Sequence, residues 1–155
     1  MYPETIIVRH KKERIQKCSV QPLTKKSGFK FISFPNERAE NLSQPYIRLA
    51  TDGEKLSKED AESGLLILDC NWRYIPDMEK DYNDVPPRTL PLFQTAYPRV
   101  AKDNTDPDQG LATIEAIYIA YCILGRDTDG LFEDYYFGDM FLKQNREKLN
   151  ALRIL

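Results

Sequence analysis

The sequence has no apolar run close to the roughly eighteen residues that a membrane-spanning helix needs. The first residues, Met1 to Glu4, show no signal-peptide pattern. We therefore expect a soluble cytoplasmic protein that has no membrane partner.

Histidine and paired cysteines are scarce as well. The chain has one histidine, His10, which excludes any site that needs two imidazoles. The three cysteines, Cys18, Cys70 and Cys122, are odd in number, far apart and without C-x-x-C spacing. We expect free thiols in a reducing compartment, with neither a disulfide framework nor a metal site. His10 is expected in a loop or against a phosphate, and no chemistry is assigned to it.

The length and composition indicate one compact unit. With 155 residues, 41% of them hydrophobic and 30% charged, the chain is long enough to bury a core. We expect two lobes within that unit, an α/β lobe over 1–96 and a mainly helical lobe over 97–155. The stretch 97–110 is polar and rich in Asp, and it predicts a long loop of the length usually kept for function.

The charge is unevenly distributed. Residues 1–30 hold eight Lys or Arg and two Glu, a net charge of +6, so the rest of the chain carries −8. The basic cluster of Lys11, Lys12, Arg14 and Lys17 could bind a polyanion such as RNA, because phosphate contacts release counterions. A solvated loop would have the same composition.

The stretch from Gly64 to Trp72 predicts the centre of the fold. Its uninterrupted apolar run, Leu65 to Leu68, is typical of a strand buried on both faces of an α/β sheet. Asp69 and Trp72 follow that strand, at the edge where such sheets bind ligands. The alternative is that Asp69 caps a helix beginning near Asn71 and that Trp72 fills the core.

Local patterns predict the other elements. β-Branched and aromatic runs predict strands over 5–9, 29–34 and 46–50, with another between Pro91 and Ala96. Residues 85–88 are expected to form an extended linker. Capping signals and apolar periodicity predict helices over 57–63, 73–81, 111–124, 131–135 and 138–152.

Five short motifs, taken in order, resemble a known superfamily. Asp69-Cys70-Asn71-Trp72 is similar to the Asp-x-x-Trp signature of two related groups, the small-subunit rRNA aminocarboxypropyltransferases and the DTW-domain tRNA-uridine aminocarboxypropyltransferases. The other matching stretches are Lys17 to Ser19, Leu90-Pro91, Leu111 to Ala116 and Gly138 to Asn145. Their collinear order covers almost the whole chain.

The resemblance implies an α/β fold with a SPOUT-like sheet, a C-terminal trefoil knot around the cofactor and a helical lobe after it. It also implies transfer of the 3-amino-3-carboxypropyl group of S-adenosylmethionine onto a (pseudo)uridine nitrogen. The partner would be a structured RNA, either rRNA or tRNA, with no DNA, and the enzyme is expected to be a monomer. Two alternatives remain open: a SPOUT-type RNA methyltransferase, and a non-catalytic RNA-binding or ribosome-assembly factor.

The resemblance also assigns residues to a site. Asp69 is the candidate base, because a carboxylate held in a partly desolvated site can take the N3 proton of a uridine. Ser19 and Thr113 would hold the amino-acid end, where the start of a helix suits a carboxylate. Apolar and aromatic side chains would surround the adenine and the sulfonium methyl: Leu49, Thr51, Trp72, Leu111 and Ala116. Backbone groups at Leu68 and near Leu92 would bind ribose and adenine.

The chain departs from both groups in several places. The rRNA enzymes have an Asn-Pro-Val-Asn-Tyr-Gly loop where this chain has the longer stretch 97–110, and they have a proline at the position of Thr51. The zinc-type cysteines of the DTW group and their Asp-Thr-Trp are absent. These differences leave open which RNA, which nucleotide and which acceptor atom is used.

Overall fold

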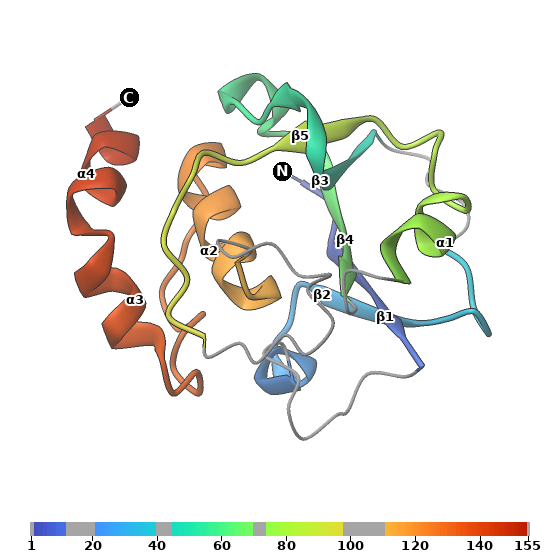
Figure 1. Ribbon diagram of the computed structural model, residues 1–155, viewed down its shortest axis with the longest axis horizontal. Coiled ribbons are helices and arrows are strands. Elements are labelled where there is room, and N and C mark those ends of the chain that lie inside the picture. Colours follow the sequence, from blue (N-terminus) through green and yellow to red (C-terminus); the bar gives the residue numbers. More distant parts are fainter. Residues whose placement is uncertain (1, 12–20, 40–44, 70–73, 98–110, 155) are drawn as a thin grey trace.

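The computed structural model describes residues 2–11, 21–39, 45–69, 74–97 and 111–154, which form a parallel five-stranded sheet with helices on both faces (Figure 1). The strand order is β2-β1-β4-β3-β5. The strands are β1 (Thr5–His10), β2 (Phe29–Phe34), β3 (Tyr46–Lys55), β4 (Gly64–Asp69) and β5 (Pro87–Thr89). The helices are α1 (Ile75–Glu79), α2 (Thr113–Leu124), α3 (Gly138–Gln144) and α4 (Arg146–Ile154), with short 3₁₀ turns η2 (Gln21–Lys25) and η3 (Lys58–Asp60). The predicted α/β class is confirmed.

The predicted central strand is β4, which pairs in parallel with β1 on one side and β3 on the other. Leu65 and Leu66 are completely buried, on opposite faces of the sheet, as the uninterrupted apolar run predicts. Gly64 begins the strand opposite Tyr46, and a Cβ atom there would collide with the tyrosine ring. Glycine is therefore required at this position by close packing.

The two faces of the sheet bury separate apolar clusters, because side chains alternate along each strand. Ile7 and Ile67 face α2 and belong to the larger cluster, which also includes Leu149 of α4. Val8 and Leu66 face the opposite side and pack with Met78 of α1. Figure 1 shows α1 on one side of the sheet and α2 on the other, with α3 and α4 outside α2. Alternate residues of a strand therefore pack against different helices, α2 on one face of the sheet and α1 on the other.

Helix α2 is buried nearly all round, as its sequence predicts: Ile114, Ile117 and Ile119 are completely inaccessible to solvent. It ends at Gly125, whose φ of +75° is the left-handed conformation that glycine adopts at helix ends. The predicted last helix, 138–152, is instead two helices separated at Asn145. The side-chain amide of Asn145 donates to the carbonyl of Phe141 and also binds the segment at Gln94, and α4 begins at the next residue.

Three predicted elements differ from the structure. The helix expected over 57–63 is only the three-residue 3₁₀ turn η3. The strand expected between Pro91 and Ala96 does not form, and the fifth strand comes earlier, at Pro87–Thr89, where an extended linker was predicted. Proline is tolerated there because β5 is an edge strand and Pro87 is its first residue. The helix expected over 131–135 is a series of turns.

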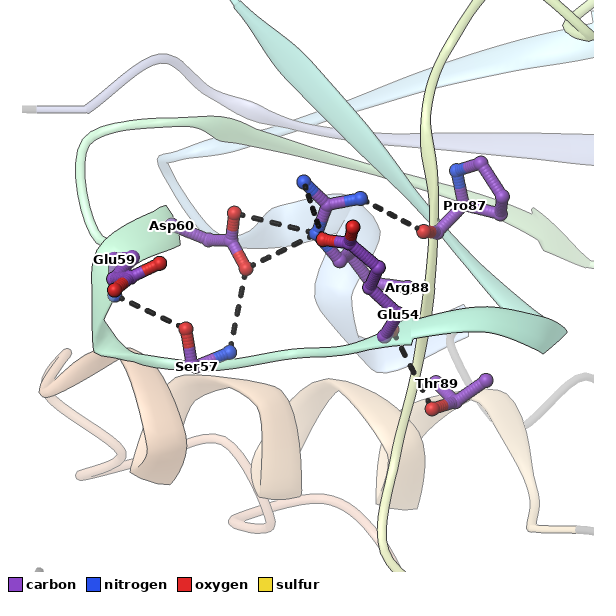
Figure 2. A network of polar contacts seen from close by, with 7 residues as sticks. All are labelled: Glu54, Ser57, Glu59, Asp60, Pro87, Arg88 and Thr89. Atoms are coloured by element: carbon purple, nitrogen blue, oxygen red, sulfur yellow. Dashed lines mark hydrogen bonds and ion pairs between the residues drawn. The ribbon is translucent and has the colours of Figure 1, made fainter.

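Arg88 attaches β5 to the rest of the sheet (Figure 2). Its Nε atom lies 3.3 Å from Oδ2 of Asp60, and its guanidinium also reaches Glu54 at 4.0 Å. Asp60 in turn accepts a hydrogen bond from the backbone N–H of Ser57, the residue that caps η3. The short edge strand is therefore stabilised by side-chain contacts as well as by its ladder.

Within the described residues, no helix is long and apolar enough to cross a membrane. The same part of the chain contains no group of three or more His, Cys, Asp or Glu side chains arranged to hold a metal ion.

Candidate functional site

Asp69 is the last residue of β4, and its side chain points to the α2 face, as those of Leu65 and Ile67 do. Its Oδ1 atom accepts a hydrogen bond of 2.7 Å from the hydroxyl of Thr113, the first residue of α2. Only 6% of Asp69 is exposed. A buried carboxylate thus lies at the carboxyl end of the central strand, directly against the start of a helix.

Arg9 provides a cation beside this carboxylate. It is the register partner of Asp69 on β1, and its Nε atom lies 3.8 Å from Oδ2 of Asp69. The guanidinium also lies over the ring of Phe31, 4.8 Å from its centroid. The sequence does not indicate Arg9 as a site residue, because neither the pairing of β1 with β4 nor its register can be read from local patterns.

The start of α2 faces the same end of the sheet. The residue before it, Ala112, is extended, and its N–H donates a hydrogen bond of 2.9 Å to Oε1 of Glu115. The N–H groups of a first helical turn have no partner within the helix, and the helix dipole adds positive potential there. Thr113 therefore presents both a hydroxyl and a helix N-terminus beside Asp69.

Glu115 is a completely buried carboxylate that the sequence analysis gave no role. Its Oε1 atom accepts from the hydroxyl of Thr95 at 2.6 Å and from the N–H of Ala112. Its Oε2 atom accepts from the N–H of Ala96 at 2.9 Å and from the hydroxyl of Tyr135 at 3.0 Å. One side chain thus joins α2 to two other parts of the chain.

His10 lies on the other face of the sheet. It is the last residue of β1, with 7% of it exposed, and its ring stacks on Tyr74 at a centroid distance of 4.4 Å. The expectation that His10 lies in a loop is wrong, because β1 extends one residue beyond the predicted strand. Strand alternation separates His10 from Asp69, since Arg9, its neighbour, takes the α2 face.

The residues predicted to surround the cofactor differ in exposure. Leu49, Leu111 and Ala116 are half-buried, and the two leucines pack against the core cluster on the α2 face. Leu68 is half-buried on the opposite face. Thr51 is exposed, near the end of the sheet where β3 carries an irregularity between Leu49 and Glu54.

Leu92 lies apart from this group. Its side chain is 73% exposed, and its carbonyl accepts a hydrogen bond of 2.9 Å from Lys148 of α4. The neighbouring Gln94 is bound through its backbone to Asn145, also on the α3–α4 side. The polar backbone groups of these two residues therefore face α3 and α4.

Several predicted site residues lie outside the described residues: Ser19 and Trp72 of the cofactor set, and Lys12, Arg14 and Lys17 of the basic cluster. Lys11 is described; it is exposed and its backbone N–H donates to the carbonyl of Phe34. The site that the structure brings together thus consists of Asp69, Thr113 and Arg9, with the apolar side chains of Leu49 and Leu111 on the same face.

No protein-family model matches the chain. Among curated proteins, the chain is 33% identical over 108 residues to a protein from Methanopyrus kandleri named 16S rRNA aminocarboxypropyltransferase. The match covers 63% of this chain and 60% of that relative, so the chain spans less than two thirds of its length. Among solved structures, the fold is similar to that of the SAM-dependent rRNA:acp-transferase Tsr3 from Vulcanisaeta distributa, with a TM-score of 0.73. That similarity covers 99% of this chain and 84% of the other at 22% identity.

Proposed function

We propose that the protein transfers the 3-amino-3-carboxypropyl group of S-adenosylmethionine onto a (pseudo)uridine nitrogen of small-subunit rRNA. The observation that carries the proposal is the hydrogen bond between Asp69 and Thr113, since it joins two of the five motifs that resemble this superfamily. Support also comes from the relative in Methanopyrus kandleri, which is named a 16S rRNA aminocarboxypropyltransferase. A monomeric enzyme and a trefoil knot in the C-terminal part belong to the same proposal and rest on the resemblance. A cytoplasmic location also belongs to it and rests on the sequence pattern alone.

The described residues fit the chemical groups of S-adenosylmethionine. The carboxylate of an amino-acid end needs positive potential, and here the Arg9 guanidinium and the start of α2 at Thr113 both lie beside Asp69. An adenosine needs apolar surface, and Leu49 and Leu111 are half-buried on the same face of the sheet. Charged groups at one end and apolar walls beside them are typical of small-molecule sites.

In this arrangement Thr113 and Ser19 would bind the amino-acid end, and Leu49, Leu111, Ala116 and Trp72 would surround the adenine and the sulfonium methyl. When bound, S-adenosylmethionine supplies an electrophilic methylene beside its sulfonium. Trp72 would cover the methyl group, so that geometry selects the methylene for attack.

Asp69 would act as the general base. The acceptor nitrogen must lose its proton as its bond to carbon forms and the carbon–sulfur bond breaks, and a carboxylate within hydrogen-bond reach can take that proton. The hydrogen bond from Thr113 fixes the orientation of the carboxylate, and Arg9 lies on its other oxygen. The burial of Asp69 excludes bulk water from the same position.

Calorimetric titration with S-adenosylmethionine tests the proposal. We expect micromolar affinity, and we expect Thr113→Val to weaken binding about tenfold, or about 1.4 kcal/mol, because it removes the hydroxyl and keeps the shape. Thr113→Ser is the matched control and should bind within about threefold of wild type. The absence of binding by folded wild-type protein would reject the proposed function.

A further inference from the structure

We propose that Glu115 is a positioning residue that fixes two separate segments, 93–96 and 111–113, relative to each other at the cofactor site. The inference rests on the proposed function and extends it, since Glu115 contacts neither the proposed cofactor nor the acceptor. It explains why a completely buried carboxylate is present in the first turn of α2.

The contacts of Glu115 suit a carboxylate that accepts on both oxygens. Both oxygens together accept four hydrogen bonds, and the partners in the described chain are neutral: two backbone N–H groups and two hydroxyls. Burying a carboxylate is costly unless it is fully hydrogen-bonded. This carboxylate is, and the four bonds come from three parts of the chain: Thr95 and Ala96, Ala112, and Tyr135.

Asn145 completes the attachment of the first segment. Its Oδ1 accepts from the N–H of Gln94, and its Nδ2 donates to the carbonyl of the same residue, each at 2.9 Å. In an antiparallel sheet, a residue of the neighbouring strand binds both the N–H and the C=O of its partner in the same way. Figure 1 shows this stretch of chain running between α2 and the α3–α4 pair.

The attachments occupy one edge of the segment. Gln94 and Ala96 are two residues apart, and the backbone groups of an extended chain alternate in direction, so both point toward Asn145 and Glu115. In the proposed site, the backbone N–H and C=O groups of Phe93 and Thr95 would use the opposite edge. That edge carries the donors and acceptors that could bind an adenine near Leu92.

The second segment carries the other end of the site. Glu115 holds the N–H of Ala112, and the next residue, Thr113, binds Asp69. A single carboxylate therefore sets the distance between the proposed adenine edge and the proposed amino-acid end. A rigid spacing of this kind lowers the entropy that binding must overcome.

Replacement by glutamine tests the role because it keeps the volume and removes one acceptor. Each oxygen of Glu115 accepts from one hydroxyl and one backbone N–H. A hydroxyl can rotate to accept from an amide NH₂, but a backbone N–H cannot. In either orientation of the glutamine, the N–H of Ala96 or of Ala112 loses its partner.

The experiment compares Glu115→Gln with Tyr135→Phe, which removes a hydroxyl donor from the same carboxylate and leaves both backbone bonds. Hydrogen exchange of the ligand-free proteins should show at least tenfold faster exchange at Ala96 or Ala112 in Glu115→Gln only. Calorimetry should show at least tenfold weaker binding of S-adenosylmethionine by Glu115→Gln, and binding within about threefold of wild type by Tyr135→Phe.

A folded Glu115→Gln variant with wild-type exchange and affinity would overturn the inference, as would equal losses of affinity in both variants. If Glu115→Gln does not fold, Asn145→Ala provides the second test: it should speed exchange at Gln94 and weaken binding, and unchanged binding would overturn the inference. If wild-type protein binds no S-adenosylmethionine, the proposed function fails, while the exchange comparison still decides whether Glu115 fixes the two segments.

Discussion

Thr113 and Asp69 are 44 residues apart in sequence and joined by a hydrogen bond of 2.7 Å. The bond connects the carboxyl end of the central strand to the first residue of the most buried helix. A helix N-terminus and a buried carboxylate thereby share one position, with Arg9 as the nearby cation.

Asp69→Asn should retain the fold and the affinity for S-adenosylmethionine but slow the transfer step at least about 100-fold. The amide oxygen can still accept from Thr113, whereas the amide cannot take the proton of the acceptor nitrogen. A single-turnover assay with rRNA measures this step directly.

Asp60→Asn is the matched control for that variant. Asp60 is a buried carboxylate that also faces an arginine, Arg88, but it lies in η3 and binds the edge strand β5 instead of Thr113 at the start of α2. The control should lose some stability and keep the wild-type transfer rate. Equal rates in Asp69→Asn and Asp60→Asn would mean that Asp69 is structural and that the base lies elsewhere.

The basic cluster should determine the salt dependence of RNA binding. If Lys11, Lys12, Arg14 and Lys17 contact phosphates, changing all four to Gln should flatten the plot of log affinity against log salt by up to about three units. The affinity for S-adenosylmethionine should stay the same. Filter binding across a salt series measures the slopes.

Parallel plots for wild type and the quadruple variant would mean that the cluster is a solvated loop. An alternative RNA path along Arg88 is less favourable, since this arginine is engaged with Asp60 and Glu54. Arg99 and Lys102, which belong to the same alternative, lie outside the described residues.

Alkaline pH should destabilise the protein through its buried tyrosines. Burial raises the pKa of Tyr121, and the hydrogen bond with Thr5 and the nearby Arg126 only partly oppose this effect. Because the folded pKa exceeds the unfolded value of about 10, the stabilisation is complete below about pH 10 and is lost as the pH rises through the folded pKa.

Tyr121→Phe removes this ionisation. It should lower the free energy of unfolding by about 1 kcal/mol at neutral pH, because the bond to Thr5 is lost, but its stability should fall less steeply above about pH 10. Urea unfolding at several pH values gives both quantities. Curves that stay parallel above about pH 10 would contradict the role of Tyr121.

The sequence predicts the central strand, the buried helix α2 and its end at Gly125, because each depends on local apolar pattern and on glycine geometry. It does not predict the path of residues 90–97. Their apolar run resembles a strand, but the backbone of Gln94 and Ala96 is satisfied by the side chains of Asn145 and Glu115 instead of a ladder. Glu115 lies in α2 and Asn145 lies between α3 and α4, both distant in sequence from this segment, so no local signal could indicate the outcome.

The site could be predicted only in part, because some of its contacts join segments that are distant in sequence. Asp69 and Thr113 lie in recognisable motifs, whereas Arg9 becomes a partner of Asp69 only through the parallel register of β1 and β4. The pattern over 138–152 predicts a single long helix that continues through Asn145. The hydrogen bonds of Asn145 to Gln94 and Phe141, at the boundary between α3 and α4, show that it also connects distant segments.

The most direct test of the proposed function is identification of both products after the protein is incubated with S-adenosylmethionine and small-subunit rRNA. Mass spectrometry should detect methylthioadenosine together with a nucleoside that carries the aminocarboxypropyl group, because attack on the methylene leaves the methyl on sulfur. Formation of S-adenosylhomocysteine together with a methylated nucleoside would contradict the proposal and identify a methyltransferase instead.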